Sequence, residues 1–252
     1  MTAACLLAGL VLAGCSRQTQ FTYEGSRLES MARDLQENAQ ADSFAKNLCV
    51  VTGEEGEEDA SVTAEAAAAF GIDSKQVIFQ KNPFERLYPA SITKIMTALI
   101  AIRDGDLTDS VTVGPETVIT ETGASLAHIN PGDTLTMEQL LYGLMLPSGN
   151  DAGAAIAVHM AGSTEAFAEK MNETAHALGA TDTHFVNPHG LNNEDHYTTA
   201  YDLYLIFNEA LKYPEFRKII GTVSYQAQYT DSTGQAKTQE WKNSNQYLNG
   251  KS

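Results

Sequence analysis

Ser91 and Lys94 are the residues whose types and spacing most directly suggest covalent chemistry. They stand three positions apart in residues 89–97, PASITKIMT. On a helix, residues three apart share a face. A serine hydroxyl beside a neutral amine is a nucleophile beside a base. Burial favours the neutral amine, because desolvation lowers the pKa of a lysine.

The helix that must position this pair runs over residues 92–102. Its side chains are apolar nearly all the way round, which is typical of a helix inside a domain. Pro89 suits the helix entry, and Ser91 then lies in the first turn, near free backbone N–H groups. For the motif alone, a capping serine and a lysine that reaches water is the simpler interpretation.

A second polar cluster, residues 147–151 with the sequence PSGND, separates two predicted helices at 137–146 and 152–161. These residue types are also common in turns and helix caps. A short rigid loop between packed helices can nevertheless present Ser148 and Asn150 to a cleft. The hydroxyl can pass a proton, and the amide can hold a substrate carbonyl.

The remaining periodicities predict an α+β fold with a helix-rich middle. Residues 64–70 favour helix by propensity, but the turn at 71–75 and the alternation over 76–80 favour a hairpin. Further expected elements are strands at 48–51, 110–113, 223–229 and 238–241, and helices at 164–178 and 198–211.

Residues 1–15 have the pattern of an export signal. Their apolar run is shorter than the about 20 residues that cross a bilayer as a helix, and it suits a secretory signal. Residues 12–15, LAGC, resemble the site at which bacterial lipoproteins are cut and acylated, here on Cys15. An ordinary secretory signal is the alternative. No Lys or Arg precedes the apolar run, which suggests a start upstream of Met1.

The net charge and the cysteine content limit the binding partners that the sequence allows. A net charge of −16 argues against binding to nucleic acid and against membrane binding through a polybasic segment. Any membrane attachment would therefore come from the N-terminal lipid. With Cys5 removed and Cys15 acylated, Cys49 is left without an intramolecular partner. The six histidines show no metal-ligand spacing, so neither a metal nor a cofactor is expected.

The order Ser91-x-x-Lys94, then Ser148-x-Asn150, resembles the first two motifs of the penicillin-binding proteins and serine β-lactamases. Four stretches resemble one branch in particular, the low-molecular-mass D-alanyl-D-alanine carboxypeptidases. These stretches are residues 89–99 (PASITKIMTAL), 147–152 (PSGNDA), 185–191 (FVNPHGL) and 196–203 (HYTTAYDL). The resemblance implies a β-lactamase/transpeptidase-like fold, with an antiparallel sheet flanked by helices and a helix-rich subdomain.

The resemblance also implies roles for individual residues. Ser91 would attack the penultimate D-alanine carbonyl of a peptidoglycan stem peptide, and Lys94 would take its proton. Ser148 would relay a proton to the leaving D-alanine, and Asn150 would bind the substrate amide. The Ser91 N–H would form half of an oxyanion hole. β-Lactams, which mimic the substrate, would acylate Ser91.

One family motif, Lys-Thr/Ser-Gly, is not found in the sequence. Lys237-Thr238-Gln239 lacks the glycine, and residues 250–252 lie too close to Asn243-Ser244-Asn245 for the family spacing. The expectation is therefore that the C-terminal strands are missing and that such a chain folds poorly and turns over little. The expected division is a lipoprotein signal at 1–15, a tether with an acidic loop at 16–59, and a C-terminally truncated carboxypeptidase domain at 60–252.

Two alternatives remain. A class A β-lactamase would need a deacylating glutamate, but the candidates lie on the predicted helix 164–178: Glu165, Glu169 and Glu173. A non-catalytic module that binds β-lactams or stem peptides is the other, and the intact Ser91–Lys94 pair disfavours it.

For His189, His196 and Asp202, packing or structural roles are expected rather than catalysis. The family resemblance implies a protein exported to the cell envelope, and the LAGC stretch implies a lipoprotein on the outer face of the cytoplasmic membrane.

Overall fold

The computed structural model describes residues 47–51 and 61–249, which belong to one compact unit, Asn47–Ser252. The expected export signal with Cys15 lies outside the described residues. So does the expected tether with its acidic loop at 16–59, apart from residues 47–51.

The described chain alternates short strands with helices. In chain order the elements are β1 (Ala67–Gly71), β2 (Gln76–Lys81), η1 (Ala90–Thr93), α2 (Lys94–Asp104), β3 (Ser110–Thr112), η2 (Pro115–Thr117), β4 (Thr134–Thr136), α3 (Met137–Met145), α4 (Asn150–Ala161), α5 (Thr164–Ala177), α6 (Ala200–Ala210), α7 (Pro214–Ile220), β5 (Ser224–Thr230), β6 (Ala236–Lys242) and η3 (Gln246–Asn249).

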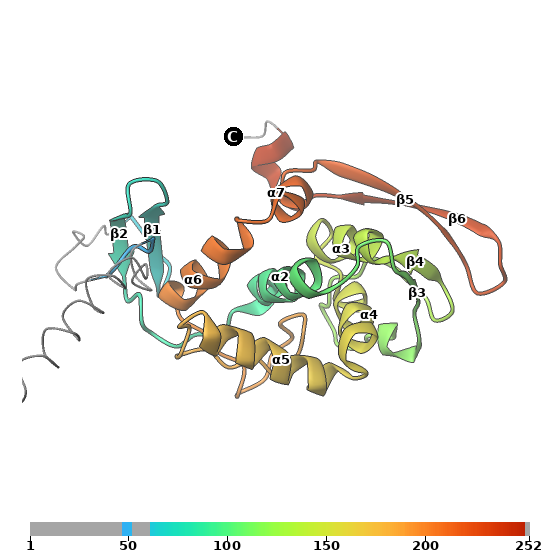
Figure 1. Ribbon diagram of the computed structural model, residues 1–252, viewed down its shortest axis with the longest axis horizontal. Coiled ribbons are helices and arrows are strands. Elements are labelled where there is room, and N and C mark those ends of the chain that lie inside the picture. Colours follow the sequence, from blue (N-terminus) through green and yellow to red (C-terminus); the bar gives the residue numbers. More distant parts are fainter. Residues whose placement is uncertain (1–46, 52–60, 250–252) are drawn as a thin grey trace, which may run out of the picture. The chain divides into compact units, whose positions relative to one another are not determined.

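Helix α2 is the centre of the packing, as its composition predicts. It contacts α3, α4, α5, α6 and α7, and Figure 1 shows these helices gathered around it. Met96, Leu99 and Ile100 are fully buried. Ile92 departs from the prediction, because it lies in the preceding turn η1 and is 49% exposed.

The strands form two antiparallel sheets, which confirms the α+β class. β1 and β2 form the expected hairpin, with a register shift between Ala69 and Phe70. The Ala-rich segment is extended here despite its helix propensity, because its Phe70 ring stacks on Tyr204 of α6, with ring centroids 4.1 Å apart. Tertiary packing thus overrides local propensity.

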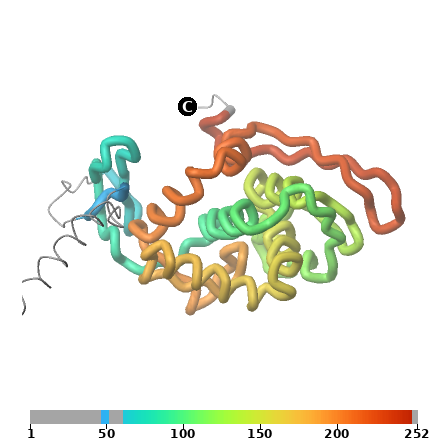
Figure 2. Tube along the Cα trace, viewed as in Figure 1, coloured from blue at the N-terminus to red at the C-terminus, as the bar shows by residue number. Residues whose placement is uncertain are grey.

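The second sheet has the order β3-β4-β5-β6. β5 and β6 confirm the two predicted C-terminal strands and pair over seven positions, and Figure 2 shows the chain folding back on itself there. Tyr225 stacks on Tyr142 of α3, at 3.8 Å between centroids, and runs nearly parallel to Trp241. The Trp241 Nε1–H donates to the carbonyl of Ala127 at 2.8 Å.

Most predicted helices are confirmed, and local signals explain their ends. Thr136 and Gln139 form a capping box at the start of α3, and Pro147 follows its end. Thr199 caps α6 by accepting from the N–H of Asp202. Helix α4 begins at Asn150, two residues before the predicted start. Strand β4 and helix α7 were not predicted.

The predicted strand at 48–51 is wrong, since this segment pairs with no strand among the described residues. Instead, two tyrosine hydroxyls of α6 satisfy the backbone of Cys49. The Cys49 N–H donates to Tyr204 Oη at 2.8 Å, and Tyr201 Oη donates to the Cys49 carbonyl at 3.0 Å. Hydrogen bonds with side chains therefore satisfy the Cys49 backbone groups that a strand would pair with a neighbouring strand.

Replacing Trp241 by Phe tests the link between β6 and the segment around Ala127. The ring stacking survives in part, but the buried Ala127 carbonyl loses its donor. We expect the free energy of unfolding to fall by about 1–3 kcal/mol, measured by urea denaturation. The control is Tyr225→Phe, which keeps the stacked ring and should cost less than about 0.5 kcal/mol. Equal losses in the two variants would contradict the assigned hydrogen bond.

Candidate active site

Three segments converge at the start of α2. Turn η1 carries Ser91, the connection from α3 to α4 carries Ser148 and leads into Asn150, and residues 187–191 close the third side. Of the predicted site residues, the structure brings Ser91, Lys94 and Asn150 into direct hydrogen-bond contact. Ser148 lies at the same turn as Asn150 without a bond to either residue of the Ser91–Lys94 pair.

The Lys94 amine is the hub of the site. Its Nζ is 3.2 Å from Ser91 Oγ, 2.7 Å from Asn150 Oδ1 and 2.7 Å from the His189 carbonyl oxygen. Lys94 itself is 2% exposed, whereas Ser91 is exposed. A buried amine therefore points at a hydroxyl that a substrate can reach, as the spacing predicts.

Burial lowers the pKa of Lys94 from 10.5 to about 8, and the negative charge of Asp151 opposes this fall. Desolvation dominates because an ammonium loses more solvation energy on burial than a neutral amine does. Three acceptors around one Nζ match the three donors of an ammonium. The structure thus holds a lysine that can be charged or neutral near physiological pH.

Ser91 lies in a strained turn. Ala90, the residue before Ser91, has a φ of +48°, a region that residues with a Cβ rarely occupy. Ala90 is the first residue of η1, and this turn passes directly into α2 at Lys94. Ser91 therefore lies in η1 and not in the first turn of the α-helix, where the sequence pattern had predicted it.

The turn between α3 and α4 explains the glycine of Ser148-Gly149-Asn150. A Cβ on Gly149 would lie 2.7 Å from the carbonyl oxygen of Gly143 and 2.8 Å from Ala127, so no larger residue fits. Ser148 adopts a φ of +61°, and its Oγ is buried with no hydrogen-bond partner among the described residues. Buried hydroxyls are normally paired, so the hydrogen-bonding capacity of this oxygen is unused among the described residues.

Residues 187–191 fold so that two carbonyls point at α2. The Asn187 side chain accepts from the N–H of Gly190 at 2.7 Å and donates to the Leu191 carbonyl at 2.9 Å. The Pro188 carbonyl accepts from Thr97 Oγ1 at 2.6 Å, beside the bond from Lys94 to His189. Gly190 has a φ of +87°, and a Cβ there would collide with the Ala90 carbonyl.

His196 holds the other side of η1. Its Nδ1 accepts from the Val186 N–H at 3.1 Å, which assigns the proton to Nε2, and Nε2 donates to Thr93 Oγ1 at 2.8 Å. Burial lowers the pKa of His196 to about 4, and burial together with the Lys94 charge lowers that of His189 to about 4. Both rings are therefore neutral near pH 7, as expected of packing and hydrogen-bonding residues.

The structure also shows where the other residues named from the sequence lie. The three glutamates considered for a class A β-lactamase are exposed on the regular helix α5. Asp202 accepts from the Asp182 N–H and from Thr183 Oγ1, which is a structural role at the start of α6. Lys237, at the imperfect third motif, pairs with Asp133 at 2.9 Å. No cluster of three or more potential metal ligands occurs in 47–51 and 61–249.

Three groups around Lys94 and η1 were not predicted from the sequence. The backbone carbonyl of His189 could not be inferred, because any residue type supplies a carbonyl. The Thr93–His196 bond joins positions 103 residues apart. Asp151 looked like a cap residue beside Asn150, and its position directly after that motif was the available signal.

Comparison with known proteins identifies the family. The D-alanyl-D-alanine carboxypeptidase family profile matches residues 53–252. The chain is 39% identical over 174 residues to D-alanyl-D-alanine carboxypeptidase DacF of Bacillus subtilis, a match that covers 67% of this chain and 45% of DacF. It is 38% identical over 154 residues to DacA of Escherichia coli, covering 58% and 38%. The chain thus spans less than half the length of these two relatives.

Solved structures agree in fold. The crystal structure of a Streptomyces DD-transpeptidase superimposes with a TM-score of 0.70 at 36% identity, covering 75% of this chain and 78% of that one. A penicillin-binding protein homologue from Mycobacterium tuberculosis gives 0.67 at 31% identity, covering 79% and 73%. The chain belongs to the D-alanyl-D-alanine carboxypeptidase family.

Proposed function

We propose that this protein is a serine-type D-alanyl-D-alanine carboxypeptidase that removes the terminal D-alanine from peptidoglycan stem peptides through an acyl-enzyme on Ser91. The observation that carries the proposal is the buried Lys94 Nζ, bonded at once to Ser91 Oγ, Asn150 Oδ1 and the His189 carbonyl. The family membership supplies the substrate class, and β-lactams are the expected inhibitors.

The acylation step follows from the bonds of Lys94. In the neutral amine, two N–H groups donate to Asn150 Oδ1 and to the His189 carbonyl, which leaves the lone pair for Ser91. The amine takes the hydroxyl proton as Oγ bonds to the substrate carbonyl carbon. A pKa of about 8 leaves roughly a tenth of the lysine neutral at pH 7.

The remaining groups serve the leaving amine and the substrate. Ser148 Oγ, buried and without a partner, passes the proton from Lys94 to the departing D-alanine amine as the peptide bond breaks. Asn150 accepts from Lys94 through Oδ1, so its Nδ2 remains to donate to a substrate carbonyl. The Ser91 N–H stabilises the developing oxyanion. Water then hydrolyses the ester and regenerates Ser91.

We also propose that the protein acts in the cell envelope, attached through lipid on Cys15 to the outer face of the cytoplasmic membrane. The LAGC stretch at residues 12–15 supports this assignment. No helix in the described part of the chain has the length and apolar character that a bilayer crossing needs.

Labelling of the full-length protein with a fluorescent penicillin tests the nucleophile. We expect stoichiometric labelling that mass spectrometry maps to Ser91, and its complete loss in Ser91→Ala, since no other hydroxyl contacts Lys94 among the described residues. Ser110→Ala, an exposed serine on β3, is the matched control and should label normally. Undiminished labelling of Ser91→Ala would refute the assignment. Labelling without catalytic release of D-alanine from a stem-peptide analogue would favour the non-catalytic binding module.

The pH dependence of acylation tests the base. Because burial lowers the pKa of Lys94 to about 8, the neutral form accumulates as pH rises through that value. The acylation rate constant should therefore climb about tenfold per pH unit below pH 7 and level off above pH 9. His189 and His196, with a pKa of about 4, do not titrate in this window. A rate that is flat between pH 6 and 9 would rule out Lys94 as the base.

Mass spectrometry of the mature N-terminus tests the lipid. We expect Cys15 to be the first residue and to carry a diacylglyceryl group, and Cys15→Ser to leave the membrane fraction. Cys49→Ser removes a buried free thiol of the folded unit and should remain at the membrane. An unmodified residue at the mature N-terminus would contradict lipidation.

A further inference from the structure

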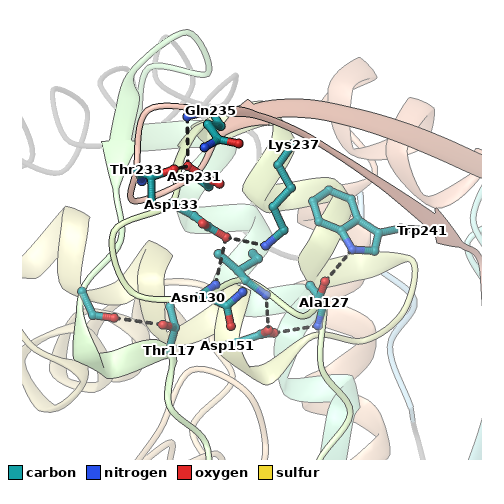
Figure 3. Close-up of polar contacts among 12 residues, drawn as sticks. Thr117, Ala127, Asn130, Asp133, Asp151, Asp231, Thr233, Gln235, Lys237 and Trp241 are labelled. Atoms are coloured by element: carbon teal, nitrogen blue, oxygen red, sulfur yellow. Dashed lines mark hydrogen bonds and ion pairs between the residues drawn. The ribbon is translucent and has the colours of Figure 1, made fainter.

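The carboxylate of Asp151 is buried beside the active site and has no role in the steps above. Asp151 directly follows Asn150 in the first turn of α4 and is 1% exposed. Its oxygens accept from the N–H groups of Ala127 at 2.8 Å and Ile129 at 3.0 Å (Figure 3), and from its own helix at Ala152. These three donors are neutral, and no ion pair to Asp151 occurs among the described residues. The negative charge is therefore solvated by backbone groups alone.

We propose that Asp151 is a positioning residue for the Ser91–Lys94 pair: its carboxylate fixes the start of α4, and with it Asn150, while its charge stabilises the ammonium form of Lys94. This inference rests on the proposed function, because it concerns the proton that Lys94 takes from Ser91. The hydrogen bonds of the Asp151 carboxylate come from backbone N–H groups and not from Ser91 or Lys94.

The first part of the proposal follows from the hydrogen bonds between α4 and residues 125–129. The Asn150 N–H donates to the Ser125 carbonyl at 2.8 Å, and Asp151 receives two N–H groups from the same segment. His128, between those two donors, has a φ of +61°, which turns both N–H groups toward one carboxylate. These bonds hold the first turn of α4 in register, so Asn150 Oδ1 meets Lys94.

The segment that Asp151 grips is itself anchored on its far side. Trp241 donates to the Ala127 carbonyl, and the Asn130 N–H donates to Asp133 at 3.0 Å. Asp133 in turn pairs with Lys237 of β6 at 2.9 Å (Figure 3). The four-stranded sheet, the segment and the start of α4 therefore form one connected support behind Asn150.

The second part follows from the charges that face Lys94. From α4, Asp151 raises the pKa of Lys94 against the larger lowering by burial. From residues 187–191, His189 faces Lys94 and is neutral near pH 7. Two further charged residues, Asp133 and Lys237, act on Tyr229 together with Asp151. They form an ion pair, so their opposite charges largely cancel. Asp151 is thus the carboxylate whose charge remains to act on Lys94.

This charge has a catalytic consequence. When Lys94 takes the Ser91 proton it becomes an ammonium in a buried site, and a fixed negative charge nearby lowers the energy of that state. Without the charge, Lys94 would be neutral at lower pH but would be a weaker base. Loss of Asp151 should therefore slow acylation at high pH and move the acid limb of the profile to lower pH.

The test compares Asp151→Asn with Asp202→Asn in the full-length protein. In Asp151→Asn we expect the NMR titration of the Lys94 Cε resonance, identified by its loss in Lys94→Ala, to move to lower pH. The ratio of the penicillin acylation rate at pH 6.5 to that at pH 9 should rise about threefold. Asp202→Asn removes another buried carboxylate, which lies in the first turn of α6 and bonds to Asp182 and Thr183, and it should leave both readouts unchanged. An unshifted Lys94 titration in Asp151→Asn, or an equal shift in Asp202→Asn, would overturn the proposal.

Asp151→Glu keeps the charge and disturbs the packing by one methylene. We expect it to lower stability but to keep the Lys94 titration near that of the unmodified protein. A fall in the Lys94 pKa in Asp151→Glu would contradict the role of the charge. The NMR titration needs no enzymatic activity, so a protein that penicillin fails to label would refute the proposed function while the Asp151 inference is still decided.

Discussion

The structure of this site depends on one physical constraint: the Lys94 side chain is buried at the start of α2, a helix that is packed on all sides by apolar residues. An unpaired ammonium in such a place costs several kcal/mol. Asn150 Oδ1, the His189 carbonyl and Ser91 Oγ together supply the acceptors that make the charge tolerable. In the neutral amine, the same three contacts direct the lone pair at Ser91 Oγ, which is the arrangement that the proposed general base requires.

Each acceptor needs a backbone conformation that ordinary residues avoid. The approach to Ser91 passes through Ala90 at a φ of +48°, and the Ser148 turn has a φ of +61°. Such conformations cost about 1–3 kcal/mol each and persist where the surroundings impose them. Gly149 and Gly190 allow the close approaches that complete the site. The helices around α2 and the sheet that contacts residues 125–129 hold the backbone in these conformations.

Much of this arrangement was predictable from the sequence, for identifiable reasons. The apolar run of α2 and the spacing of Ser91 and Lys94 are local patterns, and so are the turn after Pro147 and the alternation in β5. Strand β4 has only three residues and α7 only seven, which is too short for a period to show. The segment at 48–51 looked like a strand, but the tyrosines that satisfy its backbone lie some 150 residues away in the chain.

The site was less predictable than the fold. Residue types pointed to Ser91, Lys94, Ser148 and Asn150, but a carbonyl such as that of His189 has no signal in the residue type. The start of α4 was also predicted two residues too late. Because the helix starts at Asn150, Asp151 lies in its first turn, where an aspartate in the sequence is usually interpreted as a helix cap.

A crystal structure of the protein after reaction with penicillin would test the proposed roles of Ser91 and Lys94 directly. We expect continuous electron density from Ser91 Oγ to the opened lactam carbonyl, with Lys94 Nζ still bonded to Asn150 Oδ1 and the His189 carbonyl, and with Asn150 Nδ2 bonded to the ligand amide. Penicillin attached to another residue, or a Lys94 side chain turned out of the site, would refute these roles.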